Sequence, residues 1–122
     1  MTVTVLAVDD SRTMRNLLDA ALSEAGFDVR FAEDGAEGLK CLSEAAPDVV
    51  ITDINMPRLD GFGFIETVRR DHGNRALPIL VLTTESGTEL KARARDAGAT
   101  GWIVKPFDEE KLIAAIERVT AA

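Results

Sequence analysis

Polar side chains that can bind a metal ion or a phosphoryl group stand directly after short apolar runs of this 122-residue chain. These residues are Asp9 and Asp10, Asp53, Thr83, and Lys105. Carboxylate oxygens are the ligands that Mg²⁺ prefers, and a carboxylate can also attack phosphorus to form an acyl phosphate. A hydroxyl and an ammonium can each bind a phosphoryl oxygen. The residue types therefore indicate Mg²⁺-dependent phosphoryl transfer, provided that the fold brings them together.

The apolar runs predict strands, and the segments that follow them predict amphipathic helices. The expected strands cover residues 4–8, 28–32, 49–53, 78–82 and 102–104. Each is followed by apolar residues at the three-four spacing of one helix face. Continuous apolar strands alternating with such helices are typical of a parallel α/β sheet. We therefore expect a doubly wound, five-stranded parallel sheet in a single domain, residues 1–122, with no residues left for an output domain.

Local signals predict where the helices begin and end. Ser11 is expected to cap the first helix, and Gly26 to close it in a left-handed conformation. Asp34 is expected to open the second helix. Ser86 and Glu89 have the spacing of a capping box and predict the start of the fourth helix.

The helix faces are predicted from the same spacing. Leu17 belongs to the expected inward face of the first helix, and Phe62 to that of the third. Residues 69–75 are polar and predict a solvated loop. The fourth helix, residues 90–97, alternates alanine with lysine and arginine and has a thin apolar face. We expect it to be the least firmly packed helix.

The polar residues at the strand ends are expected to converge, because parallel strands point their carboxyl ends to one edge of the sheet. Singly, each has an ordinary explanation as a turn residue, a helix cap or a solvated lysine. Their joint occurrence at four of the five strand ends favours a site instead. Clustered carboxylates repel one another, and a divalent cation relieves that repulsion. Asp53, which follows the central strand, is our candidate nucleophile.

Composition argues against several other functions. The net charge of −7 disfavours a nucleic-acid or anionic-membrane surface, since both need clustered lysine and arginine. Cys41 is the only cysteine, and neither a signal peptide nor a membrane-spanning run is evident, so we expect a cytoplasmic protein. The only histidine, His72, lacks further ligands of the zinc-binding type and is expected at the surface. No glycine-rich phosphate loop follows the first strand, which argues against a P-loop nucleotidase.

The motifs together resemble those of response-regulator receiver domains over the whole chain, and most of all the stand-alone chemotaxis response regulators. The matching segments are Val-Asp-Asp-Ser at 8–11, Asp-Ile-Asn-Met-Pro at 53–57, Asp-Gly at 60–61, Thr83, and Lys-Pro-Phe at 105–107. The resemblance implies a flavodoxin-like (βα)5 fold with strand order 2-1-3-4-5, an order taken from the family and not from the sequence pattern. It also implies a phosphoryl acceptor that is not a multiple-turnover enzyme.

The resemblance further implies roles for individual residues of the site. Asp53 would accept a phosphoryl group from a phosphohistidine on a sensor histidine kinase of the chemotaxis type. Mg²⁺ would be bound by Asp10, Asp53 and the backbone carbonyl of Asn55, and by Asp9 largely through water. Lys105 would pair with the phosphoryl group or with Asp53.

Other residues would respond to the phosphoryl group. The Thr84 backbone N–H would contact it, Thr83 would move toward it, and the aromatic residue at position 102 would swing inward. Receiver domains usually carry Tyr or Phe there, and the bulkier Trp102 could instead stay half-buried against the fourth helix. Asn55 and Glu85 occupy the positions that tune how quickly the phosphate is lost by hydrolysis.

Two classes of function remain open from the sequence. The first is a monomeric binding module that phosphorylation controls through the surface of the fourth helix, fifth strand and fifth helix. Such a module could bind the flagellar motor switch, drain phosphate from the chemotaxis kinase as a sink, or serve an unrelated pathway. The second is an aspartyl-phosphate phosphatase of the haloacid dehalogenase type, which has a second Asp two residues after its nucleophile. This chain has Asn55 there, which cannot transfer a proton.

Overall fold

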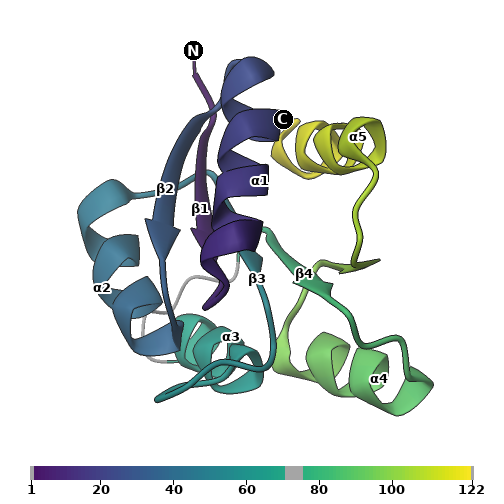
Figure 1. Ribbon diagram of the computed structural model, residues 1–122. Helices are drawn as coiled ribbons and strands as arrows, with labels where there is room; N and C mark the ends of the chain where they lie inside the picture. The colour runs from purple at the N-terminus through teal and green to yellow at the C-terminus, as the bar shows by residue number, and fades with distance from the viewer. Residues whose placement is uncertain (1, 71–75, 122) are drawn as a thin grey trace.

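Five strands and five helices alternate along the residues that the computed structural model describes, 2–70 and 76–121 (Figure 1). The strands are β1 (Thr4–Val8), β2 (Asp28–Ala32), β3 (Val49–Thr52), β4 (Ile79–Thr83) and β5 (Gly101–Val104). The helices are α1 (Arg12–Glu24), α2 (Gly35–Ala45), α3 (Gly61–Arg70), α4 (Thr88–Ala97) and α5 (Glu109–Thr120). The predicted strands are confirmed, with ends that shift by at most one residue. Within these ranges the helices are too short or too polar to traverse a bilayer.

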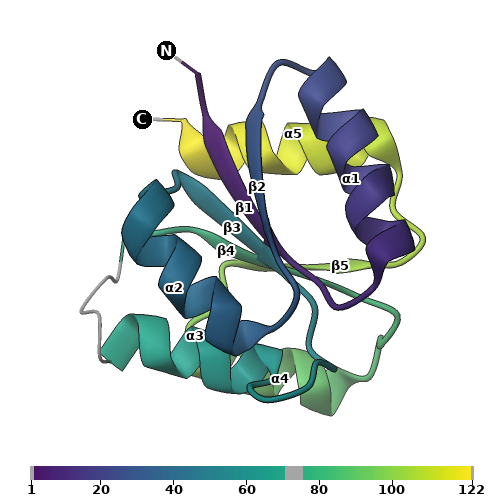
Figure 2. The same ribbon diagram turned by 60° about the vertical axis from the view of Figure 1, so that its left-hand side comes forward.

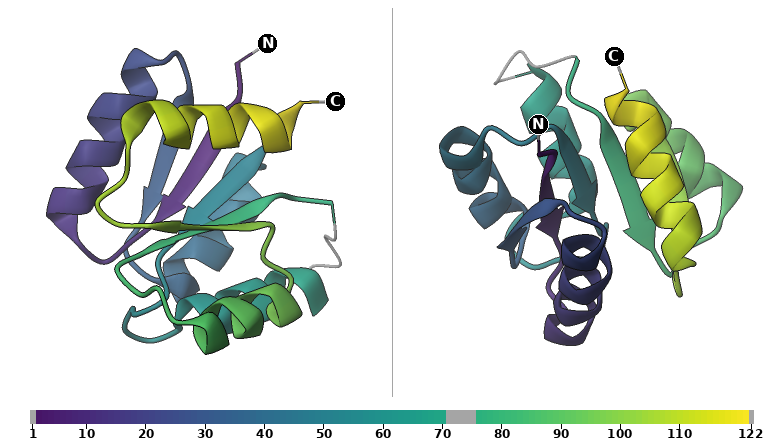
Figure 3. Two further views of the ribbon diagram at one scale, coloured as in Figure 1. Left: turned by 90° about the vertical axis from the view of Figure 1, so that its right-hand side faces the viewer. Right: turned by 90° about the horizontal axis from the view of Figure 1, so that it is seen from above.

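The strands form one parallel sheet in the order β2-β1-β3-β4-β5, which confirms the order that the resemblance implied. β1 pairs with both β2 and β3, so the chain reverses its direction of winding at β1 and lays helices on both faces. Figures 2 and 3 show α1 and α5 on one face of the sheet and α2, α3 and α4 on the other. The fold is therefore a flavodoxin-like α/β sandwich.

Side chains of the central strands alternate between two apolar cores. Leu6, Val50 and Val81 belong to the core under α2, α3 and α4. Val5 and Ile51 belong to the core under α1 and α5. β1, β3 and β4 are buried on both faces. This agrees with their almost continuously apolar sequences. β2 lies at the edge of the sheet and is only partly buried, as its alternating sequence predicted.

Two predicted helix caps are confirmed. The Ser11 hydroxyl accepts the Met14 N–H at 3.2 Å at the start of α1, and the Asp34 carboxylate accepts the Glu37 N–H at 2.9 Å at the start of α2. Gly26 has a φ of +95° just after α1, the left-handed conformation predicted for it. These caps use only neighbouring residues, which is why the sequence alone predicts them.

The start of α4 differs from the prediction. The capping box expected of Ser86 and Glu89 is wrong, because the N-cap is Gly87 and no side chain caps the helix. The helix begins one residue later than the box requires, and this places Glu89 at the second helical position, where it cannot complete a capping box. The thin packing of α4 is confirmed, since Ala94 is the one buried residue of this helix.

The inward direction predicted for Leu17 is also wrong. Its side chain is 52% exposed, one of the most exposed large apolar side chains among the described residues. The buried stripe of α1 runs instead through Leu18, Ala21 and Leu22, which face the sheet. The apolar positions of α1 are more numerous than the stripe that packs on the sheet, so one leucine is left facing solvent.

The third helix is longer than predicted. α3 continues to Arg70, two residues into the segment 69–75 that was predicted as a loop. The Arg69 guanidinium donates to the Gly98 carbonyl oxygen at 3.1 and 2.8 Å, which ties the last turn of α3 to the end of α4. Positive side chains also suit the negative end of the helix dipole. The prediction for His72 falls outside the described residues.

Gly61 fixes the distance between α3 and the strand end that carries Asp53. The Gly61 N–H donates to the Ile54 carbonyl oxygen at 2.8 Å. A Cβ atom at Gly61 would lie 2.2 Å from the Asp53 carbonyl oxygen, closer than any real contact. Any larger residue would therefore displace the helix from the backbone of the candidate nucleophile.

Asp34 caps α2 with a carboxylate that is almost completely buried, its residue being 3% exposed. Besides the Glu37 N–H, this carboxylate accepts the guanidinium of Arg58. The hydrogen bond from Glu37 and the contact with Arg58 together outweigh the effect of burial, so the pKa of Asp34 lies below its ordinary value. The folded chain therefore holds Asp34 in its ionised form.

Asp34→Ala is expected to lower the free energy of unfolding by about 1 kcal/mol near neutral pH, because α2 loses its cap. Since the pKa of Asp34 is lower in the folded than in the unfolded chain, the charge stabilises the fold above the unfolded-state pKa of about 4. This contribution is lost as the pH falls through the folded-state pKa. The stability difference between wild type and Asp34→Asn, which keeps a capping oxygen, should therefore shrink below about pH 4. Urea unfolding at a series of pH values measures it, and a constant difference would contradict the assignment.

Candidate functional site

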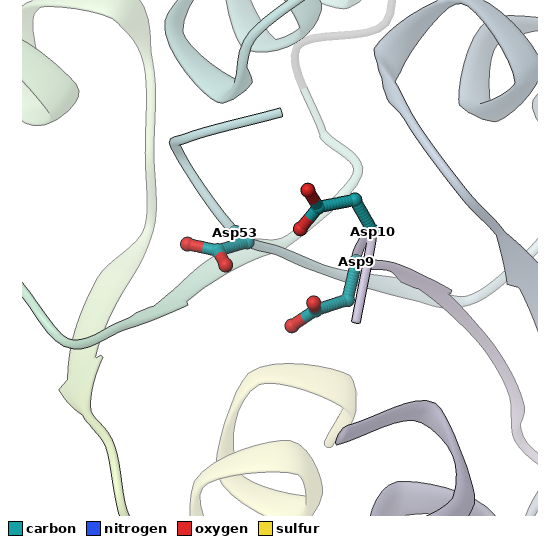
Figure 4. Close-up of side chains that lie close together, drawn as sticks. All are labelled: Asp9, Asp10 and Asp53. Atoms are coloured by element: carbon teal, nitrogen blue, oxygen red, sulfur yellow. The ribbon is translucent and has the colours of Figure 1, made fainter. Parts of the chain in front are cut away.

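Three carboxylates meet at the carboxyl edge of the sheet (Figure 4). Oxygens of Asp9, Asp10 and Asp53 all lie within 4.8 Å of one another. Asp9 and Asp53 are buried, whereas Asp10 is exposed to solvent. The convergence predicted from the strand ends is therefore confirmed for these three residues.

Backbone hydrogen bonds of the sheet hold two of these residues in place. The Asp53 N–H donates to the Val8 carbonyl oxygen at 2.9 Å, and the Asp9 N–H donates to the Ala32 carbonyl oxygen at 3.0 Å. Each bond continues the ladder of a parallel strand pair one residue past the strand. The carboxylates consequently sit on rigid backbone at the mouth of the sheet, where open α/β sheets bind their ligands.

Lys105 joins the two buried carboxylates. Its Nζ lies 2.8 Å from Asp9 Oδ2 and 2.9 Å from Asp53 Oδ2, and its side chain is only 10% exposed. The Lys105 N–H donates to the Thr83 carbonyl oxygen at 2.7 Å, continuing the pairing of β4 with β5. The solvent-facing alternative for this lysine is thereby excluded.

The electrostatics of the site follow from burial and from these hydrogen bonds. Burial raises the pKa of Asp9 above its ordinary value, although the hydrogen bonds from Lys105 and from the Ser11 N–H oppose the rise. Burial alone would lower the pKa of Lys105, but its hydrogen bonds to Asp9 and Asp53 outweigh burial and raise it. Lys105 is therefore held as a cation among carboxylates.

The donor set fits Mg²⁺. The cluster offers only carboxylate oxygens, and three carboxylates face a single ammonium, which leaves excess negative charge. Mg²⁺ binds through few carboxylates and keeps several waters, so an exposed ligand such as Asp10 suits it. Zinc is a poor match, because it prefers histidine and cysteine ligands. The resemblance to receiver domains implied a Mg²⁺ site at these same acidic residues.

Thr83 and Thr84 stand at the end of β4, on the same edge of the sheet. Thr83 is buried, with 1% exposure, and its Oγ1 accepts the Glu85 N–H at 3.4 Å. Thr84 is exposed. The structure therefore brings the Thr83 backbone next to Lys105, while Thr84 begins the loop that leads into α4.

Asn55 and Glu85 come from different loops at the carboxyl edge of the sheet, and their side chains approach each other. The Asn55 Nδ2 lies 3.5 Å from the Glu85 Oε1, at the long limit for a hydrogen bond. Asn55 is exposed and Glu85 is partly buried. The contact links the loop after β3 to the loop after β4.

Trp102 is partly buried on β5 and contacts the core that includes Ala94 of α4. Its Nε1–H donates to the Glu85 carbonyl oxygen at 3.0 Å, so the indole ring is anchored to the β4–α4 loop. This is the half-buried packing against the fourth helix that the sequence left as one of two alternatives for Trp102.

One cation beside the site was missed by the sequence analysis. The Arg15 Nη1 donates to the Asp9 carbonyl oxygen at 2.7 Å, and its Nη2 lies 3.7 Å from a carboxylate oxygen of Glu33. A positive side chain in the first turn of a helix opposes the helix dipole. Arg12 stands in the same turn, so the sequence alone does not single out Arg15.

Comparisons with known proteins agree with this geometry. The family model described as "Response regulator receiver domain" matches residues 5–117. The probable chemotaxis protein CheY of Rhizobium etli is 40% identical over 121 residues, which cover 98% of this chain and 94% of the relative. Protein PilG of Pseudomonas aeruginosa is 33% identical over 113 residues, which cover 93% of this chain and 84% of that protein.

Solved structures of similar length share the fold. The chemotaxis response regulator CheY4 of Vibrio cholerae superposes with a TM-score of 0.92 at 44% identity, over 98% of this chain and 99% of that chain. A putative response regulator from Chloroflexus aurantiacus superposes with a TM-score of 0.93 at 33% identity, over the full length of both chains. The likeness therefore extends over nearly all of the sequence and is not confined to the site.

Lys105→Met is expected to lower the free energy of unfolding by about 3 kcal/mol in the presence of a chelator, because two neighbouring carboxylates lose the cation between them. Lys111→Met removes an exposed lysine from α5 and should change stability by less than about 0.5 kcal/mol. Urea unfolding measures both variants. Equal effects of the two substitutions would show that the ammonium of Lys105 does not hold the acidic cluster together.

Proposed function

The chain belongs to the response-regulator receiver family, and on this premise we propose that it is a Mg²⁺-dependent phosphoryl acceptor, phosphorylated on Asp53 by a sensor histidine kinase. The observation that carries the proposal is the Lys105 ammonium, hydrogen-bonded to both Asp9 and Asp53 beside a third carboxylate. Receivers of this type are phosphoacceptors and not turnover enzymes, so the phosphatase alternative is set aside.

Asp53 is the nucleophile in this proposal. Its Oδ1 accepts the Ile54 N–H at 2.7 Å, and its Oδ2 accepts the Lys105 ammonium, so the carboxylate is fixed in orientation. A carboxylate oxygen forms a bond to phosphorus while the phosphorus–nitrogen bond of the kinase phosphohistidine breaks, and the imidazole of the kinase leaves. The product is an aspartyl phosphate with two further ionisable oxygens.

Asp10, Asp53 and the backbone carbonyl of Asn55 hold Mg²⁺ in this proposal, and Asp9 contributes through water. When bound there, Mg²⁺ would supply positive charge that offsets the charge on the transferring phosphoryl oxygens. Asp9 has a second role in addition to its water-mediated contact with the ion, because its carboxylate accepts a hydrogen bond from the Lys105 ammonium.

Lys105 and the start of the β4–α4 loop receive the phosphoryl group. The Lys105 ammonium exchanges its contact with the Asp53 carboxylate for one with a phosphoryl oxygen. The Thr84 backbone N–H donates to another phosphoryl oxygen, and the hydroxyl of Thr83 moves toward the group. The proximity of β4 and β5 at this edge supports these roles.

Thr83 and Trp102 carry the change outward. When Thr83 moves toward the phosphoryl group, space opens beneath the β4–α4 loop, and Trp102 gives up its bond to the Glu85 carbonyl oxygen and turns inward. The surface of α4, β5 and α5 then presents a different face to a partner. Asn55 and Glu85, in contact in front of Asp53, tune how quickly water removes the phosphoryl group.

Chemotaxis is the process that the proposal favours, in line with the printed names of the Rhizobium and Vibrio relatives. The kinase is then of the chemotaxis type, and the phosphorylated chain binds the flagellar motor switch as a cytoplasmic monomer. A second candidate is a phosphate sink that drains this kinase. A motor-binding regulator would co-purify with motor switch protein when phosphorylated. A phosphate sink would instead exchange its phosphoryl group back to the kinase.

Incubation with Mg²⁺ and an acyl phosphate is expected to add one phosphate per chain, visible as a mass increase in intact-protein mass spectrometry. Asp53→Asn should remain unmodified, because the amide is not a nucleophile for phosphorus. Asp48→Asn is the matched control, since it makes the same charge change at the opposite end of β3 and should be phosphorylated like wild type. Equal labelling of Asp53→Asn would overturn the assignment of the acceptor.

The emission of Trp102 is expected to change in intensity or wavelength on phosphorylation, because the ring leaves its hydrogen bond to the β4–α4 loop. Trp102 is the only tryptophan, so fluorescence reports this residue alone. The same additions to Asp53→Asn should leave the emission unchanged. A phosphorylated wild-type chain with unaltered emission would show that Trp102 does not take part in the switch.

A further inference from the structure

An ion pair links two loops at the carboxyl edge of the sheet. The Arg58 Nε lies 2.7 Å and its Nη2 2.6 Å from the same oxygen, Oδ2 of Asp34. The two residues are 24 positions apart in sequence. Asp34 belongs to the turn between β2 and α2, and Arg58 to the loop between β3 and α3. Asp53 is the first residue of the second loop.

The backbone conformation of Arg58 is unfavourable for an arginine, which indicates that its side chain has a structural role. Its φ is +66°, in the left-handed region that is unfavourable for residues with a side chain and that glycine and asparagine adopt readily. The Arg58 side chain is itself 64% exposed, but its guanidinium contacts a carboxylate that is almost fully buried, so the pair differs from one in which both partners face solvent. The structure therefore retains an arginine where the backbone alone would favour glycine or asparagine.

Neighbouring backbone bonds tie the same loop at both ends. The Gly61 N–H donates to the Ile54 carbonyl oxygen at 2.8 Å, next to Asp53. At the far end, the Gly35 N–H donates to the Leu59 carbonyl oxygen at 3.0 Å, which fastens the loop to the start of α2. Asn55 lies between these ties, so its backbone position depends on both.

We propose that Arg58 and Asp34 are positioning residues for the divalent-cation site. By holding the far end of the β3–α3 loop to α2, the pair keeps the loop in the conformation that presents the Asn55 backbone beside Asp53. This inference rests on the proposed function, because it concerns the same Mg²⁺ ligands. Neither residue touches the phosphoryl group, so both act through the loop.

Replacement of Arg58 changes Mg²⁺ affinity in opposite directions under the two explanations, one based on charge and the other on loop positioning. Removing the positive charge of Arg58 from a loop beside an acidic cluster should strengthen the binding of a cation. Loss of loop positioning should weaken it, as the loss of groups that orient metal ligands commonly does. The direction of the change therefore separates the two explanations.

Arg58→Asn removes the guanidinium and leaves a residue that tolerates the left-handed backbone, so the fold should persist. The dissociation constant for Mg²⁺, from amide chemical shifts in a titration, is expected to rise about tenfold. Exchange of the Gly35 amide hydrogen should accelerate, because its bond to Leu59 is no longer supported. Arg30→Asn is the matched control: it makes the same charge change at an exposed ion pair with Asp28 and should leave Mg²⁺ affinity unchanged.

Phosphorylation by an acyl phosphate gives a second readout. In Arg58→Asn the Mg²⁺ concentration for the half-maximal rate should rise by the same factor, while the rate at saturating Mg²⁺ stays near that of wild type. Arg58→Lys, which keeps the charge, should recover part of the affinity. The double variant with Asp34→Asn restores the net charge and should be no weaker than Arg58→Asn alone, because the pair acts as one unit.

The outcomes are distinguishable. Weaker Mg²⁺ binding by threefold or more in Arg58→Asn, with an unchanged Arg30→Asn, supports the inference. Unchanged or tighter binding, or additive losses in the double variant, overturns it and leaves the proposed function standing. Failure of the wild-type chain to bind Mg²⁺ overturns the proposed function, and this inference with it.

Discussion

The contact of one ammonium with carboxylates from two strands is the constraint around which this edge of the molecule is arranged. Two buried carboxylates a few ångströms apart would repel each other strongly at the low effective dielectric of a protein. The ammonium of Lys105 offsets that repulsion. It can do so only if the residue that follows β5 lies close to the ends of β1 and β3. The sheet register and the backbone bond from Lys105 to Thr83 satisfy this requirement. A charged site is thereby built on paired strands, and the loops around it add ligands without having to assemble it.

Much of this arrangement could be predicted from the sequence because it depends on periodicity and on local contacts. The apolar runs indicate parallel strands, and parallel strands place Asp9, Asp53 and Lys105 at one edge whatever their order. Caps such as Ser11 involve residues three apart and leave a readable pattern. The strand order itself came from the family resemblance, since no pattern in a single sequence encodes which strands are neighbours.

The features that escaped prediction involve distant partners. Arg15 and Arg58 each bind a group that a sequence pattern cannot identify, because the partner is brought near only by the completed fold. The failed capping box at Ser86 and the exposed Leu17 have a related cause: tertiary packing decides where α4 begins and how much of α1 the sheet can cover. Local sequence rules therefore give several possible helix starts and buried positions, and tertiary packing determines which of them occur.

The thin attachment of α4 has a consequence for how such a module diversifies. A helix that buries little more than Ala94 contributes few contacts to the core, so its outward positions can change without endangering the fold. If α4 forms part of the partner surface, as the proposed function has it, substitutions on this helix alone would change which partner is bound. The acidic edge, and with it the chemistry of the site, would be left as it is.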